Sequence, residues 1–161
     1  MPNPPGAARD VALRCALWAL LGGWTGAWAL FAFVVARVAF AVLPTTQLAG
    51  QIVAPVLAAL HLYGAVAGVA LAALAWALAR TRIAIGLPLV LSALCLVSHF
   101  AVTAEIESIR DLVFGPGGSP ELAARFQRLH GLSMWIYTAV GLGAYGLLYL
   151  HVRADAERAR P

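Results

Sequence analysis

The 161-residue chain is too apolar for an ordinary soluble domain, because 62% of its residues are hydrophobic and only 11% are charged, whereas soluble proteins contain roughly 45–50% apolar residues. Its mean hydropathy of +0.85 predicts one small all-α integral membrane domain. The net charge of +4 comes from arginines scattered at the ends of apolar segments. They form no continuous basic face, so we expect the lipid bilayer as a partner and no nucleic acid.

The first apolar run follows a short N-terminal segment that is rich in proline. Residues 1–10 contain three prolines and a glycine and are expected to form a flexible tail. Residues 11–35 are long enough to cross the roughly 30 Å of hydrocarbon in a bilayer. Within this run Gly22 and Gly26 lie four residues apart, a spacing that lets two membrane helices approach closely. This face is a candidate surface for a homo-oligomer or a membrane partner.

The second apolar run follows a residue that is predicted to cap the N-terminus of a helix. Thr45 can cap a helix, and residues 56–78 form the predicted span. His61, Gly64 and Gly68 share one face of that helix at about 100° per residue. The face is a groove of small residues with a histidine near its start, and it is a second candidate surface for a partner.

The third run follows a tight basic turn at residues 80–82, which is short enough to predict an antiparallel helical hairpin. Its span begins at Ile83 or Leu87 and ends at about Val102. Five residues of this helix, extended past the span, fall on one narrow polar face at about 100° per residue, with Glu107 at its margin: Ser92, Cys95, His99, Thr103 and Arg110. Since hydrocarbon offers no hydrogen-bond partners, we expect this polar stripe to face the inside of the bundle.

The fourth run follows a Gly/Pro-rich loop in which Ser119 is a predicted helix cap. Residues 129–150 form its span, with His130 and Ser133 on one face, and residues 152–161 are a charged C-terminal tail. The prediction is therefore an integral membrane four-helix bundle over residues 11–151, built from two antiparallel hairpins.

The arginines predict the orientation. Seven lie in the N-terminal segment, the middle turn and the C-terminal segment, and four lie in the other two connections. Cytoplasmic segments are enriched in positive charge. We therefore expect a multi-pass protein of a cell inner membrane with both termini in the cytoplasm.

In this topology three histidines, His61, His99 and His130, should lie at similar depth near the outer leaflet, close to Arg110. We then expect replacement of Arg110 or His130 to lower thermal stability more than replacement of the wetter His151. Three interpretations stay open. The polar groups stabilise the packed bundle, they bind a small molecule or ion, or the three imidazoles bind a metal or haem in a redox protein.

The residues of the candidate binding site are His61, His99, Thr103, Arg110, His130 and Ser133. A metal, if one is bound, has His61, His99 and His130 as its candidate ligands. The chain has no CxxCH or HxxxH motif, no GxSxG and no phosphate-binding loop, so nothing in it indicates an enzyme. We expect a non-enzymatic protein without a cofactor, with a purely structural membrane subunit as a further alternative.

Several ordered motifs together resemble one family of membrane proteins. They are Gly22-Gly23-Trp24, residues 31–35, Leu43-Pro44, residues 49–55, residues 106–110 and residues 126–133. The set is similar to the transmembrane protein two-zero-five-like family, whose bacterial members are membrane domains without an assigned reaction. The resemblance implies a four-helix integral membrane protein, with eukaryotic relatives associated with resistance to platinum drugs. By this resemblance, Arg110, His130 and Ser133 correspond to motif positions of the family. The chain departs from the family pattern at two positions, where Glu105 stands in place of a Pro and Tyr137 in place of an Asn.

Overall fold

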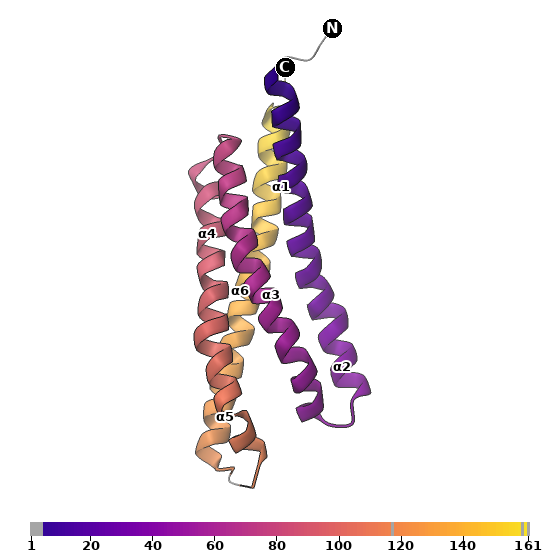
Figure 1. The fold of residues 1–161 in the computed structure, drawn as a ribbon, viewed down its shortest axis with the longest axis vertical. Helices are drawn as coiled ribbons and strands as arrows, with labels where there is room; N and C mark the ends of the chain where they lie inside the picture. The colour runs from indigo at the N-terminus through magenta and orange to yellow at the C-terminus, as the bar shows by residue number, and fades with distance from the viewer. Residues whose placement is uncertain (1–4, 117, 159, 161) are drawn as a thin grey trace.

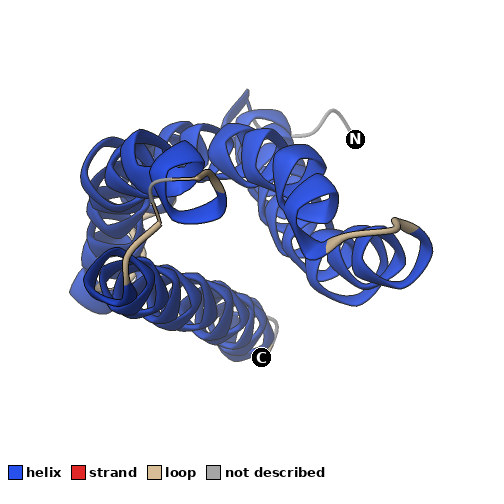
Figure 2. Ribbon diagram, turned by 90° about the horizontal axis from the view of Figure 1, so that it is seen from below, coloured by secondary structure: helices blue, strands red, loops and turns tan. Residues whose placement is uncertain are grey.

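The computed structural model describes residues 5–116, 118–158 and 160, and every regular element in this part of the chain is a helix (Figure 2). The elements are α1 (Pro5–Leu30), η1 (Phe31–Val35), α2 (Ala36–Val42), α3 (Thr46–Ala77), α4 (Arg82–Val97), η2 (Ser98–Thr103), α5 (Ala104–Phe114) and α6 (Pro120–Arg158). The segments η1 and η2 are π-helical turns inside longer helices. The predicted all-α class is confirmed.

Four continuous helices in the described residues are long and apolar enough to cross a membrane: Gly6–Val42, Thr46–Ala77, Arg82–Phe114 and Pro120–Arg158. They run up and down along one long axis (Figure 1). One end of the molecule, the terminal end, carries the start of α1, the α3–α4 turn and the end of α6. The opposite end, the loop end, carries the α2–α3 and α5–α6 connections. The chain is thus a multi-pass helical membrane protein.

Each long helix packs against two others. The first helix contacts α3 and α6, and α4 also contacts α3 and α6, which closes a ring of four. The core between them is formed by large apolar side chains such as Leu17, Leu21, Trp24, Leu71 and Leu147, all fully buried. Close packing of these side chains fixes which helices pair. The hydrophobic effect cannot do so, because lipid surrounds an apolar side chain as favourably as the core of the bundle does.

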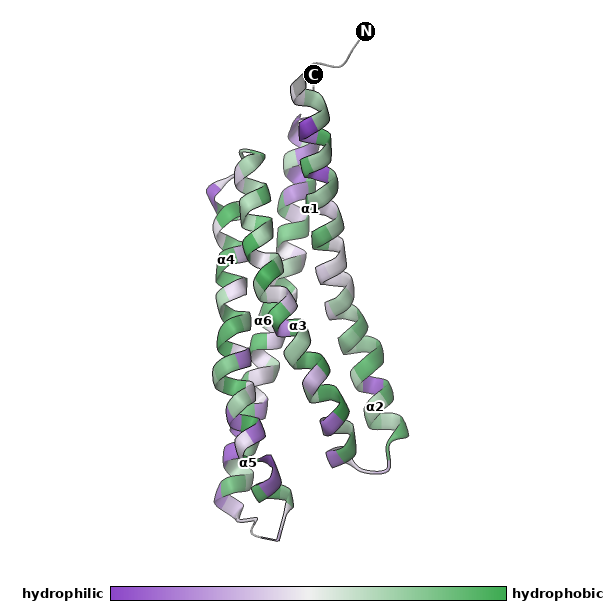
Figure 3. Ribbon diagram, viewed as in Figure 1, coloured by the Kyte–Doolittle hydropathy of each residue, from purple (hydrophilic) through white to green (hydrophobic). Residues whose placement is uncertain are grey.

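The outer surface of the bundle is apolar. Large side chains such as Phe33, Val66 and Trp135 are 69%, 71% and 76% exposed. Figure 3 shows hydrophobic colouring along the middle of the helices and hydrophilic colouring concentrated toward the two ends. This distribution matches the hydrocarbon and headgroup layers of a bilayer.

The α3–α4 turn is held by a Schellman motif. Ala79 has a positive φ of 49°, the Arg80 amide donates to the Ala75 carbonyl at 2.9 Å, and the Ala79 amide donates to the Trp76 carbonyl at 2.9 Å. Glycine usually occupies the left-handed position of this motif. The antiparallel hairpin predicted from the short turn is therefore present, with alanine in an unfavourable conformation at its corner.

The two predicted tails differ from the structure. Residues 1–4 of the first lie outside the described residues, whereas residues 5–10 belong to α1. In the second, residues 152–158 continue α6 as a helix because Asp155 and Arg158 hydrogen-bond to side chains and carbonyls of the other helices. The charges of this segment are part of the folded bundle.

Candidate functional site

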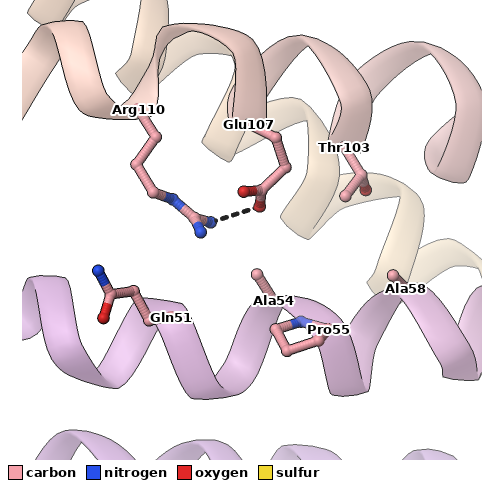
Figure 4. Close-up of a pocket in the computed structure, with 7 residues that line it drawn as sticks. All are labelled: Gln51, Ala54, Pro55, Ala58, Thr103, Glu107 and Arg110. Atoms are coloured by element: carbon pink, nitrogen blue, oxygen red, sulfur yellow. Dashed lines mark ion pairs between the residues drawn. The ribbon is translucent and has the colours of Figure 1, made fainter.

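A groove opens at the loop end between α3 and the helix formed by η2 and α5. Its volume is about 400 Å³, and its lining comes from α3 on one side and from η2 and α5 on the other: Gln51, Ala54, Pro55, Ala58, Thr103, Glu107 and Arg110. These seven side chains face one another across the space between the two helices (Figure 4). The volume falls in the roughly 300–1,000 Å³ range of small-molecule sites.

The groove exists because the first half of α3 is loosely packed. Between Thr46 and Ala59 only Ala49 is buried, and the side chains directed at the groove from α3 are small. This part of α3 lies beside α2 and away from α5 (Figure 1). Pro55 lies inside the helix, and a proline removes one backbone hydrogen bond and favours a kink. The two helices therefore separate toward the loop end.

The mouth of the groove is charged. The Nη2 atom of Arg110 lies 2.7 Å from Oε1 of Glu107, one turn earlier on α5, and the Arg110 side chain is only 14% exposed. Arg110 and Gln51 extend into the groove from opposite walls (Figure 4). A guanidinium has five N–H donors, so Arg110 can bind a further acceptor in the groove while it holds Glu107.

Two histidines lie about one helical turn beyond the residues that line the groove. On α3, His61 follows Ala58 on the same helix face, and on η2, His99 precedes Thr103 by one turn. The two lie at one level because α3 and α4 pack where a Cβ on Gly64 would be 2.9 Å from Sγ of Cys95. His61 lies three residues before Gly64 and His99 four residues after Cys95 on antiparallel helices, so both lie about one turn closer to the loop end.

His61 is fully buried, and neither of its ring nitrogens has a hydrogen-bond partner among the described residues. Three more buried atoms in the same part of the bundle lack a partner within the described chain: Nε1 of Trp24, Oγ of Ser98 and Nδ1 of His99. A buried polar group without a partner costs about 1–3 kcal/mol. Buried polar atoms of this kind are usually satisfied by ordered water or a ligand.

A stacked pair of aromatic rings lies next to His61. The rings of Trp28 and Tyr137 stack with centroids 4.5 Å apart, and the edge of Trp28 meets the His61 ring at 5.7 Å. Trp28 Nε1 donates to the Tyr137 carbonyl at 3.0 Å, and the Tyr137 hydroxyl donates to the Trp28 carbonyl at 2.6 Å. Gly141 makes room for this pair, since a Cβ there would lie 2.9 Å from the indole of Trp28. The stacked rings and their two hydrogen bonds therefore connect α1 to α6.

The π-helical turn η2 carries three of the polar residues near the groove: Ser98, His99 and Thr103. A π-turn inserts one extra residue and rotates the following side chains around the helix, and such turns are frequent at functional sites. Thr103 lines the groove, whereas Ser98 is fully buried. The turn thus brings polar groups from two helix faces toward the same region.

His130 does not join the other two histidines. It is exposed on α6, where its ring stacks on Phe126 with centroids 6.2 Å apart and an interplanar angle of 2°. It precedes Tyr137 by seven residues, which places it about 10 Å nearer the loop end. The expectation of one layer of three inward-facing histidines is therefore wrong for His130.

Ser133 is buried on α6 but is not among the residues that line the groove. In the part of the chain that the structure describes, no group of three or more His, Cys, Asp or Glu side chains is arranged to hold a metal ion. Of the six candidate residues, Thr103 and Arg110 line the groove, His61 and His99 lie about one turn beyond it, and the three metal candidates are not brought together.

The two helix faces that contain paired glycines, Gly64/Gly68 and Gly22/Gly26, differ in whether another helix packs against them. The Gly64/Gly68 face is used inside the molecule: a Cβ on Gly68 would lie 2.5 Å from the Pro88 carbonyl oxygen, and the adjacent Ser92 hydroxyl donates to the Ala65 carbonyl at 2.7 Å. It is therefore not open to a partner, contrary to expectation. On the other face, a Cβ added to Gly22 or Gly26 would meet no atom within 4 Å.

Gln51 and Glu107 line the groove although the sequence pattern did not select them. Gln51 is one of two glutamines, with Gln47, in the otherwise apolar helix α3, which is a usable signal, because an amide is costly against lipid. Glu107 lies at the margin of the polar stripe. Trp24 and Ser98 carried no signal, since their exposure depends on how the helices rotate against one another.

The fold and the groove define a multi-pass helical membrane protein with a mostly apolar groove at its loop end, lined by a few polar side chains. No known protein family, curated protein or solved structure matches this chain. The resemblance to the transmembrane protein two-zero-five-like family stays a prediction.

Proposed function

We propose that this protein binds a small, mostly apolar molecule in the loop-end groove and performs no reaction on it. The fully buried His61, whose ring nitrogens have no partner among the described residues, carries this proposal. It follows Ala58, a lining residue of the groove, by one turn of α3 and lies outside the lining itself. A ligand with a polar group at its inner end would supply the hydrogen bonds that the protein leaves open.

The walls of the groove define the rest of the ligand. Ala54, Pro55 and Ala58 offer an apolar surface along α3, which fits a hydrocarbon or ring body. At the mouth, Arg110 provides charge-assisted donors for an acceptor group. The ligand class is therefore an amphiphile of small-molecule size with acceptors at its ends.

We place this protein in a cell inner membrane with both termini in the cytoplasm, on the strength of the arginine distribution. In that orientation the groove opens toward the outer leaflet. Reporter fusions at residues 44 and 116 test this placement, because both connections are then accessible from outside, whereas a fusion at residue 80 is not.

A solvent-extraction experiment tests the binding function. The protein is purified in maltoside detergent, and bound compounds are extracted and identified by mass spectrometry. Ala58→Phe fills the groove and should remove the compound that copurifies with the wild type. Ala73→Phe adds the same ring at an exposed position of α3 and should retain it.

The same preparations distinguish the other interpretations. Equal yields of extracted compounds from both variants and the wild type, or none from any of them, would mean that the polar groups only stabilise the bundle. A Soret band or a stoichiometric metal would instead support the redox alternative with His61 and His99.

A further inference from the structure

A second polar cluster lies at the terminal end, far from the groove, and we name it the terminal-end network. Its members come from α1, the α3–α4 turn and α6: Asp10, Arg14, Trp18, Arg80, His151, Asp155 and Arg158. Asp155 is its centre. Its Oδ1 accepts hydrogen bonds from Arg14 at 3.2 Å and from Arg80, and its Oδ2 accepts one from Trp18 Nε1 at 3.1 Å.

Arg80 is the most deeply buried charge of this network. Its side chain is 1% exposed, and Asp155 binds only its Nη2 atom. The Nε and Nη1 atoms have no hydrogen-bond partner within the residues that the structure describes. A guanidinium stays charged at any physiological pH, so these N–H groups require an acceptor that carries negative charge or a strong dipole.

His151 offers a third open nitrogen beside Arg80. The residue is 1% exposed, and its Nδ1 has no partner in the described chain. It precedes Asp155, which binds Arg80, by one turn on α6, and its ring meets the edge of Trp18 at 6.5 Å. Three open nitrogens are thus buried in one small region.

The charges of the network do not balance. Arg14 is paired with Asp10 at 2.8 Å, and Asp155 is shared by Arg14 and Arg80. Arg158 donates to the Leu78 carbonyl at 2.6 Å. Three guanidinium groups therefore accompany two carboxylates, so the network carries a net positive charge that attracts anions, although Arg158 itself is exposed.

We propose that the terminal-end network binds one small inorganic anion between Arg80 and His151. The N–H groups of the guanidinium and of a His151 tautomer protonated at Nδ1 would donate to it. The phosphate of a lipid headgroup offers the same charge, but the burial of both side chains favours a small anion such as chloride. A bound anion would link the α3–α4 turn to α6.

Thermal unfolding in a phosphate-free maltoside detergent tests the proposal with chloride as the probe. Sodium chloride replaces sodium gluconate at constant ionic strength, so general screening is unchanged. At a chloride concentration tenfold above its Kd, Tm should rise saturably by roughly 3–5 °C. Equal Tm values in both salts would overturn the proposal and assign the open nitrogens to water.

Variants locate the site. His151→Phe keeps the ring packing against Trp18 and removes Nδ1, so the chloride-dependent rise in Tm should fall to less than half. Arg153→Gln on the same helix removes an exposed arginine that pairs with Glu157, and it should leave the rise unchanged. A full rise in His151→Phe would contradict the site.

A second measurement does not depend on the variants. Chloride NMR line broadening by the wild-type protein should be present and should be reduced by bromide, which competes for the same site. A separate arm adds phosphatidylglycerol to the gluconate sample. If that lipid alone raises Tm and chloride does not, the occupant is a headgroup and the small-anion proposal is wrong.

Discussion

The terminal end and the loop end of this bundle are built from the same helices but are held together differently. At the terminal end, Asp155 connects α1, the α3–α4 turn and α6 through side chains that are 141 and 75 residues away in sequence. At the loop end, α2 has no buried residue in the described chain, and the first half of α3 has one. The tight end anchors the helices, and the loose end leaves space for a ligand.

The ion pairs show the same contrast. The Arg80 side chain is 1% exposed in its pair with Asp155, whereas Glu107 is 46% exposed in its pair with Arg110 one turn away. The Glu107–Arg110 pair lies within one helix, and the pair that joins α5 to α6 at this end, Glu105 with Arg125, is exposed to 36% and 56%. Burial and long sequence separation make the Arg80 pair a tertiary lock, while the Arg110 pair leaves its helix free to move relative to α3.

The largest expected effect comes from removing the charge of Asp155. Asp155→Asn removes the only carboxylate that binds the buried Arg80 among the described residues and that also binds Arg14, so the free energy of unfolding in chloride-free buffer should fall by about 3 kcal/mol. Glu107→Gln breaks the exposed pair at the loop end and should cost at most about 1 kcal/mol. Unfolding curves in mixed detergent micelles measure both. Equal losses would mean that the two ends are locked alike.

A single glycine substitution in each half of α3 should have opposite signs. Gly68→Ala places a Cβ 2.5 Å from the Pro88 carbonyl oxygen, so α3 and α4 must separate, at a cost of about 1–3 kcal/mol. Gly50→Ala meets no atom within 4 Å and should stabilise the helix by about 0.5–1 kcal/mol. The same unfolding curves decide, and a loss at Gly50 would show that the loop half is packed.

Replacement of His61, which lies beside the groove, should have opposite effects on stability and on ligand binding. His61→Phe removes two nitrogens that lack partners in the described residues while it keeps a ring of similar size. The free energy of unfolding should rise by about 1–2 kcal/mol, and the copurified compound should disappear. A variant that is less stable than the wild type would show that His61 is already satisfied by structural water.

The smallest effect concerns the corner of the α3–α4 turn. Ala79→Gly relieves the positive φ of 49° and should raise the free energy of unfolding by about 0.5–1 kcal/mol. Ala41→Gly in α2 makes the same substitution in regular helix, where it should lower stability by up to about 1 kcal/mol. The difference in Tm between the two variants measures the effect, and a destabilised Ala79→Gly would contradict the strain at the corner.

The structure reverses one expectation about stability. The sequence placed His130 among buried partners and His151 at the wet end of its helix. Instead, His151 is 1% exposed, whereas His130 is exposed. Replacing His151 should therefore cost more stability than replacing His130. Both residues lie on α6, and the pattern of that helix alone did not indicate which of its faces meets α1.

Local chemistry was readable from the sequence. Four apolar runs of membrane length, the cap at Thr45 and the cap at Ser119 depend on neighbouring residues only, and both caps are present: the Leu48 amide donates to Thr45 Oγ1 and the Leu122 amide donates to Ser119 Oγ, each at 3.2 Å. The polar stripe with His99, Thr103 and Arg110 also followed from helical spacing.

Only the tertiary structure decided which polar groups meet. In a soluble protein the apolar face of a helix identifies the core, but in this chain the lipid-facing and core-facing sides are both apolar. The rotation of each helix is then set by its close contacts, such as Gly68 against Pro88 and Trp28 against Gly141. Those contacts brought His61 and His99 to one level beside the groove, left His130 exposed, and joined Arg80 to Asp155.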